Sequence, residues 1–192
     1  MLLENCKIGF AMTGSFCVID DVLPEMQRLL NEKCKITPIF SETVYNTDTR
    51  FFLAKDLIET VKNMTGMLPL HTIEQVEPIG PKNLLDMLVI APCTGNTIAK
   101  MAAGVVDSPV LMAAKAVIRN NRPVVIAVST NDGLGNNAAS LGFLLAKKNF
   151  YFVPFGQDNP KDKPNSLVAD MTKIADTCML AMEFRQIQPL LV

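Results

Sequence analysis

The sequence of 192 residues contains no tryptophan, one histidine and two tyrosines, and only 6% of its residues are aromatic. Aromatic side chains on which bases could stack are therefore scarce. Lysine and arginine form no basic run, and the formal net charge is −1. Because nucleic acids are bound mainly through clustered positive charge, we expect no nucleic acid partner.

Long apolar runs are also missing. The longest are strand-sized, well short of the ~20 residues that cross a bilayer, so we expect no membrane span. The N-terminal residues show no cleavable signal pattern, which favours a cytoplasmic protein.

Clustered metal ligands and familiar catalytic motifs are absent as well. The five cysteines are widely spaced without a CxxC pair, so we expect neither a disulfide framework nor a metal site. No P-loop, Ser/His/Asp arrangement or carboxylate pair is visible. His71 lies in a segment rich in proline and glycine, where an exposed or capping role is more common than catalysis. Cys93 is expected to be a packing residue, although it lies within the most informative loop of the chain.

Hydrophobic residues make up 49% of the chain and form short buried-strand patterns that alternate with helical patterns. This order predicts an α/β fold, a three-layer, doubly wound and mainly parallel sheet, in a single domain over residues 1–192. A polar linker, residues 157–166, is expected before a C-terminal helix. The expected strands are 7–12, 35–41, 87–91, 122–130 and 150–156, and the expected helices are 16–33, 50–64, 98–105, 108–121, 140–148 and 166–184.

The segment APCTGNTIAK, residues 91–100, joins a buried strand to a helix. Its small residues let a ligand approach the backbone, Thr94, Asn96 and Thr97 can hydrogen-bond it, and the helix N-terminus attracts anions. Ligands in open α/β sheets bind at the carboxyl ends of the strands. We therefore expect the cofactor here.

Residues 13–15, 41–43 and 129–135 follow three other strands and should lie beside this segment on one edge of the sheet. The Gly14-Ser15 turn opens a helix, which suits a phosphate group. Each loop alone could be an ordinary turn, but together they favour a phosphorylated ligand. The segment GLGNNA, residues 133–138, imitates a dinucleotide fingerprint, yet it does not directly follow its strand, so a plain loop is the first interpretation and an NAD site the second.

Residues 91–100 resemble the signature A-P-[AS]-[ST]-A-N-[ST]-I-A-K of the homo-oligomeric flavin-containing cysteine decarboxylase (flavoprotein) family, and GFAMTGS resembles that family's opening I-T-G-S. The match covers about Lys7 to Phe155. The resemblance implies a Rossmann-like domain that binds FMN and assembles as a homo-oligomer built from trimers. Carried over by position, Gly14, Ser15 and Ser41 would hold the flavin phosphate; Pro92, Thr94, Gly95, Asn96 and Thr97 would line the ribityl chain and ring; and Ser129, Thr130 and Asn131 would form a third ring-contacting loop.

Two departures from the family pattern argue against decarboxylation. Counting back thirteen residues from Ala91, where the decarboxylases have a histidine, gives Pro78, and His71 lies seven residues too early. The family's substrate clamp P-x-M-N-x-x-M-W reads VSTNDGLG here and keeps only Asn131. Gly95 also replaces the family's alanine.

The segments TNDGLG, DSPVLMAAKA and VPFGQDNPKDKPNS resemble one component of a two-component member of the family. That resemblance implies joint action with an A subunit, which would carry NAD(P), to oxidise a dihydropyridine dicarboxylate to its aromatic pyridine in the mother cell of a sporulating bacterium. Asn131 and Arg50 are the catalytic candidates, because an arginine suits a carboxylate; Lys115, Arg119 and Arg122 are alternatives to Arg50. Three hypotheses remain: a catalytic flavin subunit, a non-catalytic partner of the A subunit, and a flavin-dependent decarboxylase or prenyl transferase.

Overall fold

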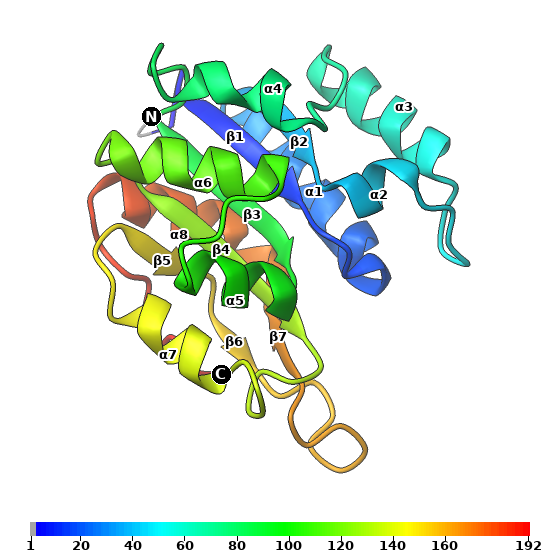
Figure 1. The fold of residues 1–192 in the computed structure, drawn as a ribbon, viewed down its shortest axis with the longest axis vertical. Helices are drawn as coiled ribbons and strands as arrows, with labels where there is room; N and C mark the ends of the chain where they lie inside the picture. Colours follow the sequence, from blue (N-terminus) through cyan, green and yellow to red (C-terminus); the bar gives the residue numbers. More distant parts are fainter. Residues whose placement is uncertain (1–2) are drawn as a thin grey trace.

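The computed structural model describes residues 3–192, and its framework is a seven-stranded sheet between two layers of helices (Figure 1). Five parallel strands form most of it. β7 pairs antiparallel with the carboxyl end of β4, and β6 pairs antiparallel with β7. The order is β2-β1-β3-β4-β7-β6, with β5 also paired to β4. The strands are β1 (Lys7–Met12), β2 (Lys35–Phe40), β3 (Met87–Cys93), β4 (Val124–Thr130), β5 (Phe150–Phe152), β6 (Phe155–Gly156) and β7 (Leu167–Ala169).

Helices cover both faces of the sheet. In Figure 1, α4, α5 and α6 lie in front of it, while α1 and α8 lie behind it. All seven residues of β3 are buried because this central strand is covered on both sides. The helices are α1 (Ile19–Asn31), α2 (Glu42–Asn46), α3 (Ala54–Thr65), α4 (Ile73–Val76), α5 (Gly95–Ala102), α6 (Pro109–Arg119), α7 (Ala138–Leu145) and α8 (Ile174–Met182), and short 3₁₀ turns are η1 (Phe16–Val18), η2 (Glu77–Ile79) and η3 (Met171–Lys173).

The predicted fold class, α/β with a mainly parallel sheet, is confirmed, but the C-terminal third differs from the prediction. The expected last strand, 150–156, is two strands, β5 and β6, interrupted at Val153 and Pro154. The expected helix over 166–184 begins only at Ile174. Residues 167–169 instead form β7, because Leu167 and Val168 pair with the end of β4 and extend the sheet.

Three further differences concern helices. The helix after residue 94 ends at Ala102, since Gly104 adopts a left-handed φ of 73° close behind it. Val105, expected on the apolar helix face, therefore lies beyond the helix and is 40% exposed. The helix expected from Arg50 begins at Ala54, and residues 42–46, expected as a turn, form the short helix α2. No helix within residues 3–192 is long and apolar enough to cross a bilayer.

Candidate functional site

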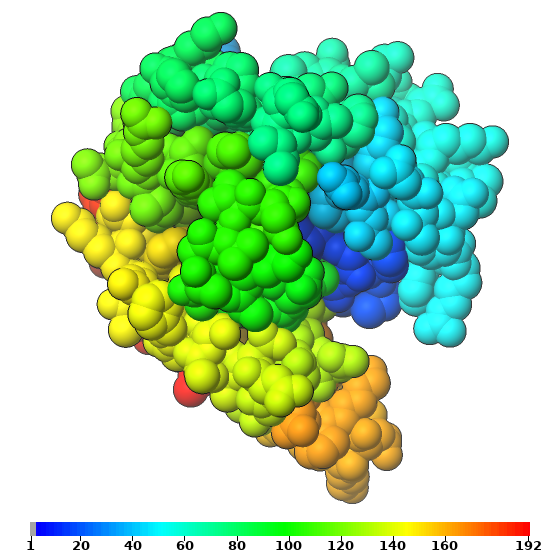
Figure 2. Space-filling model, viewed as in Figure 1, coloured from blue at the N-terminus to red at the C-terminus, as the bar shows by residue number. Residues whose placement is uncertain are grey.

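A cavity of about 820 Å³ opens at the carboxyl ends of β1, β3 and β4, where the topology predicted a ligand site. This volume lies in the range of ordinary cofactor and substrate pockets. Figure 2 shows the surface hollowed between the blue N-terminal segment and the orange loop of residues 157–166. The wall is built from residues 14–17, 50–51, 94–96, 99, 129–132, 136–137, 158, 163, 166 and 168.

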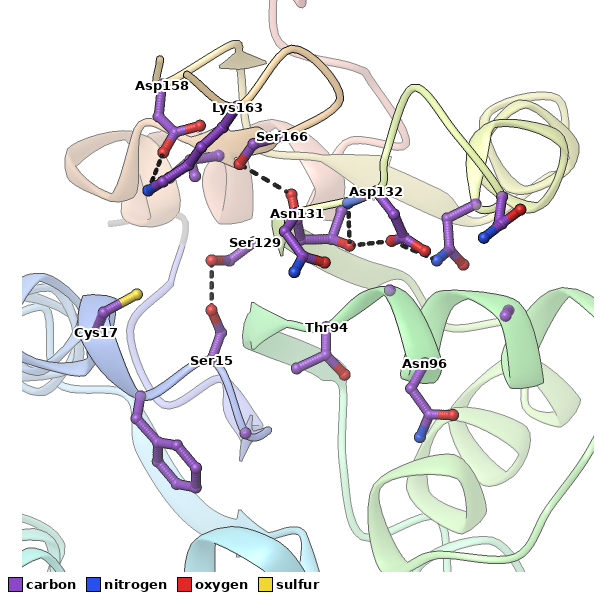
Figure 3. Close-up of a pocket in the computed structure, with 18 of the residues that line it drawn as sticks. Ser15, Cys17, Thr94, Asn96, Ser129, Asn131, Asp132, Asp158, Lys163 and Ser166 are labelled. Carbon is purple, nitrogen blue, oxygen red and sulfur yellow. Dashed lines mark hydrogen bonds and ion pairs between the residues drawn. The ribbon is translucent and has the colours of Figure 1, made fainter. Parts of the chain in front are cut away.

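Side-chain hydrogen bonds tie the strand ends together on the inner side of this cavity. The buried Thr13 hydroxyl donates to the Pro92 carbonyl oxygen at 2.7 Å and accepts from the Thr94 N–H at 3.0 Å. The hydroxyl oxygens of Ser15 and Ser129 are 2.6 Å apart, and Figure 3 shows them pointing toward one another. Three loops distant in sequence are thereby held as one polar surface.

The first turn of α5 faces the cavity. The Thr94 hydroxyl caps this helix by accepting from the Thr97 N–H at 3.3 Å, and Gly95 and Asn96 line the wall beside it. Figure 3 shows Thr94 just before the green helix and Asn96 in its first turn. Exposed N–H groups and the helix dipole make such a turn favourable for negative charge.

A second polar cluster lies against the start of α5. Asp132 Oδ1 accepts from the Thr130 hydroxyl and from Asn137 Nδ2, each at 2.6 Å. Asn137 is only 8% exposed, and its Oδ1 has no hydrogen-bond partner among the described residues. A buried carbonyl oxygen without a donor is costly, so this cavity wall suits a ligand with an N–H group.

The loop of residues 157–166 forms the outer wall (Figure 3). Lys163 Nζ lies 3.4 Å from Asp158 Oδ2, and the Ser166 hydroxyl donates to the Thr130 carbonyl oxygen at 3.2 Å. Hydrogen bonding by Ser166, and more weakly by Lys163, holds the pKa of Asp158 below its usual value. The segment predicted only as a linker therefore belongs to the cavity.

Most of the predicted site residues meet at this cavity. Three of them do not line it. Ser41 caps α2 by accepting from the Val44 N–H at 3.3 Å, Pro92 is buried with its carbonyl bonded to Thr13, and Thr97 is buried with its hydroxyl 3.0 Å from that of Thr94. The predicted residues that do line the cavity are Gly14, Ser15, Arg50, Thr94, Gly95, Asn96, Ser129, Thr130 and Asn131.

Of the four cations considered for carboxylate binding, only Arg50 lines the cavity; Lys115, Arg119 and Arg122 lie outside its wall. His71 also lies outside and stacks on Tyr45 with the ring centroids 3.6 Å apart. Cys93 is fully buried, and burial raises the pKa of its thiol, which makes it unreactive.

Sequence reasoning missed several polar residues of the wall, among them Asp132, Asn137 and Lys163. The first two follow Asn131 within the same polar loop, and that proximity was an available signal. Lys163 belongs to a segment without periodicity, so only the tertiary structure could place it.

Comparison with known proteins gives one family. The flavoprotein family model matches residues 2–176. The B subunit of dipicolinate synthase from Bacillus subtilis (strain 168) is 46% identical over 190 residues, covering 99% of this chain and 95% of that protein. The crystal structure of the B subunit of dipicolinate synthase from Bacillus halodurans C superposes with a TM-score of 0.92 at 46% identity, covering 100% of this chain and 98% of that one. The FMN-dependent cysteine decarboxylase SpaF shares the fold, with a TM-score of 0.65 at 17% identity and coverage of 95% and 99%.

Proposed function

Since this chain belongs to the flavoprotein family, we propose that it acts with a separate A subunit to oxidise dihydrodipicolinate to dipicolinate during sporulation. The observation that carries this proposal is 46% identity over 99% of the chain to the B subunit of a dipicolinate synthase. The proposed activity places the protein in the cytoplasm of the mother cell, with NAD(P) on the A subunit.

We infer that the cavity holds FMN. Gly14 and Ser15 open η1 at one end of it and suit the phosphate, while the first turn of α5 and the loop after β4 would line the ribityl chain and ring. The unpartnered Asn137 Oδ1 fits the N–H group of a flavin ring. A bound flavin supplies a two-electron acceptor.

The chain's own residues would bind and orient the dicarboxylate. Arg50 carries its guanidinium over the Phe51 ring, 4.8 Å from the centroid, and both residues line the cavity. A guanidinium binds a carboxylate through two parallel hydrogen bonds. Asn131, exposed on the loop after β4 and part of the same cavity wall, would add an amide donor. Together they would set the substrate's position against the electron acceptor.

A homo-oligomer built from trimers accompanies this proposal. An apolar groove of about 430 Å³ lies between α5, α6 and α7, lined among others by Met101, Ile118 and Phe143. Phe143 is 47% exposed in the single chain, and contact with another copy would cover it.

The proposal is tested with the purified chain and its A subunit. We expect the chain to show the visible absorbance of oxidised flavin and to release FMN on heating, as identified by mass. We expect dipicolinate to form only when both subunits, substrate and oxidised NAD(P) as electron acceptor are mixed. A colourless chain that takes up no added FMN would move the electron transfer to the A subunit. Absence of dipicolinate formation by the two subunits together would refute the proposed activity.

A further inference from the structure

We propose that Asp132 is the general base that removes the substrate proton during aromatisation. The inference rests on the proposed oxidation and assigns a role to the residue directly after Asn131, at a position that the family's clamp pattern leaves unspecified. Asp132 follows β4, lines the cavity and is half-buried beside Asn131.

The carboxylate of Asp132 is held in one orientation with one oxygen left over. Oδ1 accepts two hydrogen bonds, from Thr130 Oγ1 and Asn137 Nδ2, both at 2.6 Å. Within residues 3–192, no group donates a hydrogen bond to Oδ2. A base needs a lone pair free to receive the proton and a side chain held in place, and the free Oδ2 and the two hydrogen bonds to Oδ1 supply these.

The start of α5 is shaped around this carboxylate. A Cβ built on Gly95 would lie 2.5 Å from Thr130 Oγ1, 2.6 Å from Asn137 Nδ2 and 2.8 Å from Asp132 Oδ1. The glycine at this position therefore leaves the volume that the three polar groups occupy. The cluster is packed into the cavity wall, and only a residue without a side chain permits it.

The other titratable groups of the cavity are less suited to accept a proton. Arg50 and Lys163 are hydrogen-bond donors only. Asp158 is already paired with the Lys163 ammonium, which favours its charged form. Cys17 is exposed and projects from η1, across the cavity from Asp132 (Figure 3).

The chemistry requires such a base. Aromatising a dihydropyridine removes one ring hydrogen as hydride, which passes to an acceptor of the flavin or nicotinamide class. A second ring hydrogen leaves as a proton, and the electron pair of its bond forms the last double bond of the pyridine. Asp132 takes that proton and becomes a neutral acid, which returns the proton to water after product release.

The test compares Asp132→Asn with wild type in the complex of both subunits. The asparagine carbonyl can still accept from Thr130 and Asn137, so the cluster and the fold are retained while the base is removed. We expect kcat to fall by about 10²- to 10⁴-fold, the usual contribution of a general base. KM should stay near the wild-type value, and the product dianion should bind at least as tightly because one negative charge is gone. Asp56→Asn, an exposed carboxylate on α3 outside the cavity, is the matched control and should retain full activity.

A second variant guards against a purely structural effect. Asp132→Ala should regain part of its lost kcat when formate is added, in proportion to formate concentration, whereas a misfolded site gains nothing. Full kcat in Asp132→Asn would overturn the assignment, as would loss of activity confined to Cys17→Ser. If the wild-type subunits make no dipicolinate at all, the proposed function fails instead, so the two failures are distinguishable.

Discussion

At the scale of single residues, Gly95 is the glycine of the cavity wall at which an added methyl group should have the largest consequence. In Gly95→Ala, the new Cβ would lie within 2.8 Å of three polar atoms, so the cluster of Thr130, Asp132 and Asn137 must separate. We expect destabilisation of about 1–3 kcal/mol, as for other overpacked sites, together with loss of activity. Urea unfolding and dipicolinate formation measure the two effects.

Gly142→Ala is the matched control for this substitution. Gly142 lies within α7, and a Cβ there would meet nothing within 4 Å. Alanine in a helix is favoured over glycine, so this variant should gain roughly 0.5–1 kcal/mol and keep its activity. Equal effects of the two alanines would show that the cluster does not depend on the space at Gly95.

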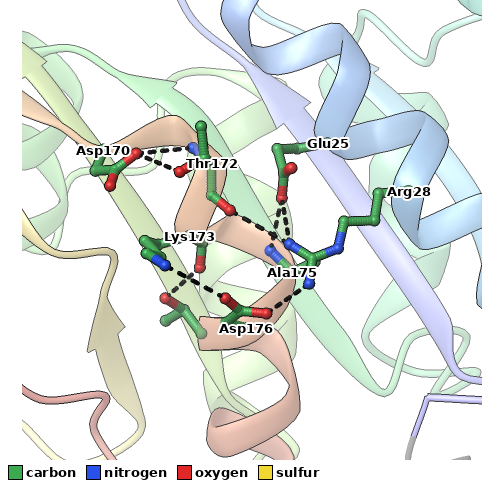
Figure 4. A network of polar contacts seen from close by, with 8 residues as sticks. Glu25, Arg28, Asp170, Thr172, Lys173, Ala175 and Asp176 are labelled. Atoms are coloured by element: carbon green, nitrogen blue, oxygen red, sulfur yellow. Dashed lines mark hydrogen bonds and ion pairs between the residues drawn. The ribbon is translucent and has the colours of Figure 1, made fainter.

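At the scale of elements, the contact between α1 and α8 depends on one buried carboxylate. Glu25 is 8% exposed, and its Oε2 accepts from the Ala175 N–H at 3.1 Å in the first turn of α8 (Figure 4). Arg28 reinforces the contact, with its guanidinium 2.6 Å from Asp176 Oδ1. The hydrogen bond from Arg28 to Asp176 raises the pKa of the arginine. The negative charge of Glu25 also lies where the helix dipole favours it.

Glu25→Ala should lower the free energy of unfolding by about 1–3 kcal/mol, because the buried Ala175 N–H loses its acceptor. Glu25→Gln keeps an acceptor and should lose less. Arg28→Ala should cost at most about 1 kcal/mol, since the arginine side chain is 42% exposed. Denaturant unfolding of the three variants gives this order; a larger loss in Arg28→Ala than in Glu25→Ala would contradict it.

At the scale of the whole molecule, the five cysteines differ in their exposure to solvent, and we expect their thiols to differ in reactivity accordingly. Cys17 is exposed, whereas the other four cysteines are buried. Desolvation raises the pKa of Cys6 to about 12 and that of Cys34 to about 11. A thiol reagent should therefore label one cysteine rapidly in the native protein and all five after unfolding.

The same pKa shifts predict the direction of alkaline destabilisation. The folded state keeps the Cys6 and Cys34 protons that the unfolded chain releases near its ordinary thiol pKa, so folded protein binds more protons above about pH 9. The contribution of these two thiols to the free energy of unfolding is fully present below that pH. For Cys6 it is lost progressively as the pH rises to about 12. Urea midpoints measured across this range should fall, and Cys6→Ala should make the fall less steep. A midpoint that rises with pH would contradict the assignment.

The sequence by itself determined the parallel framework and the edge that carries the site. Apolar runs such as residues 87–91 and 124–128 are readable because a strand covered on both faces must be hydrophobic throughout. Residues 13–15, 94–96 and 129–131 could be assigned to one edge because the carboxyl ends of parallel strands point the same way. The signature around Asn96 also identified the family.

Only the tertiary structure decided what depends on contacts between distant segments. β7 has no strand-like length of its own, and it exists because Leu167 and Val168 find partners on β4. Lys163 enters the cavity wall because the loop between β6 and β7 folds back over Thr130 through Ser166. The need for a glycine at position 95 arises only because Asp132 and Asn137 pack against it. Periodicity and propensity describe neighbours along the chain, whereas side-chain packing joins residues that are far apart in the sequence.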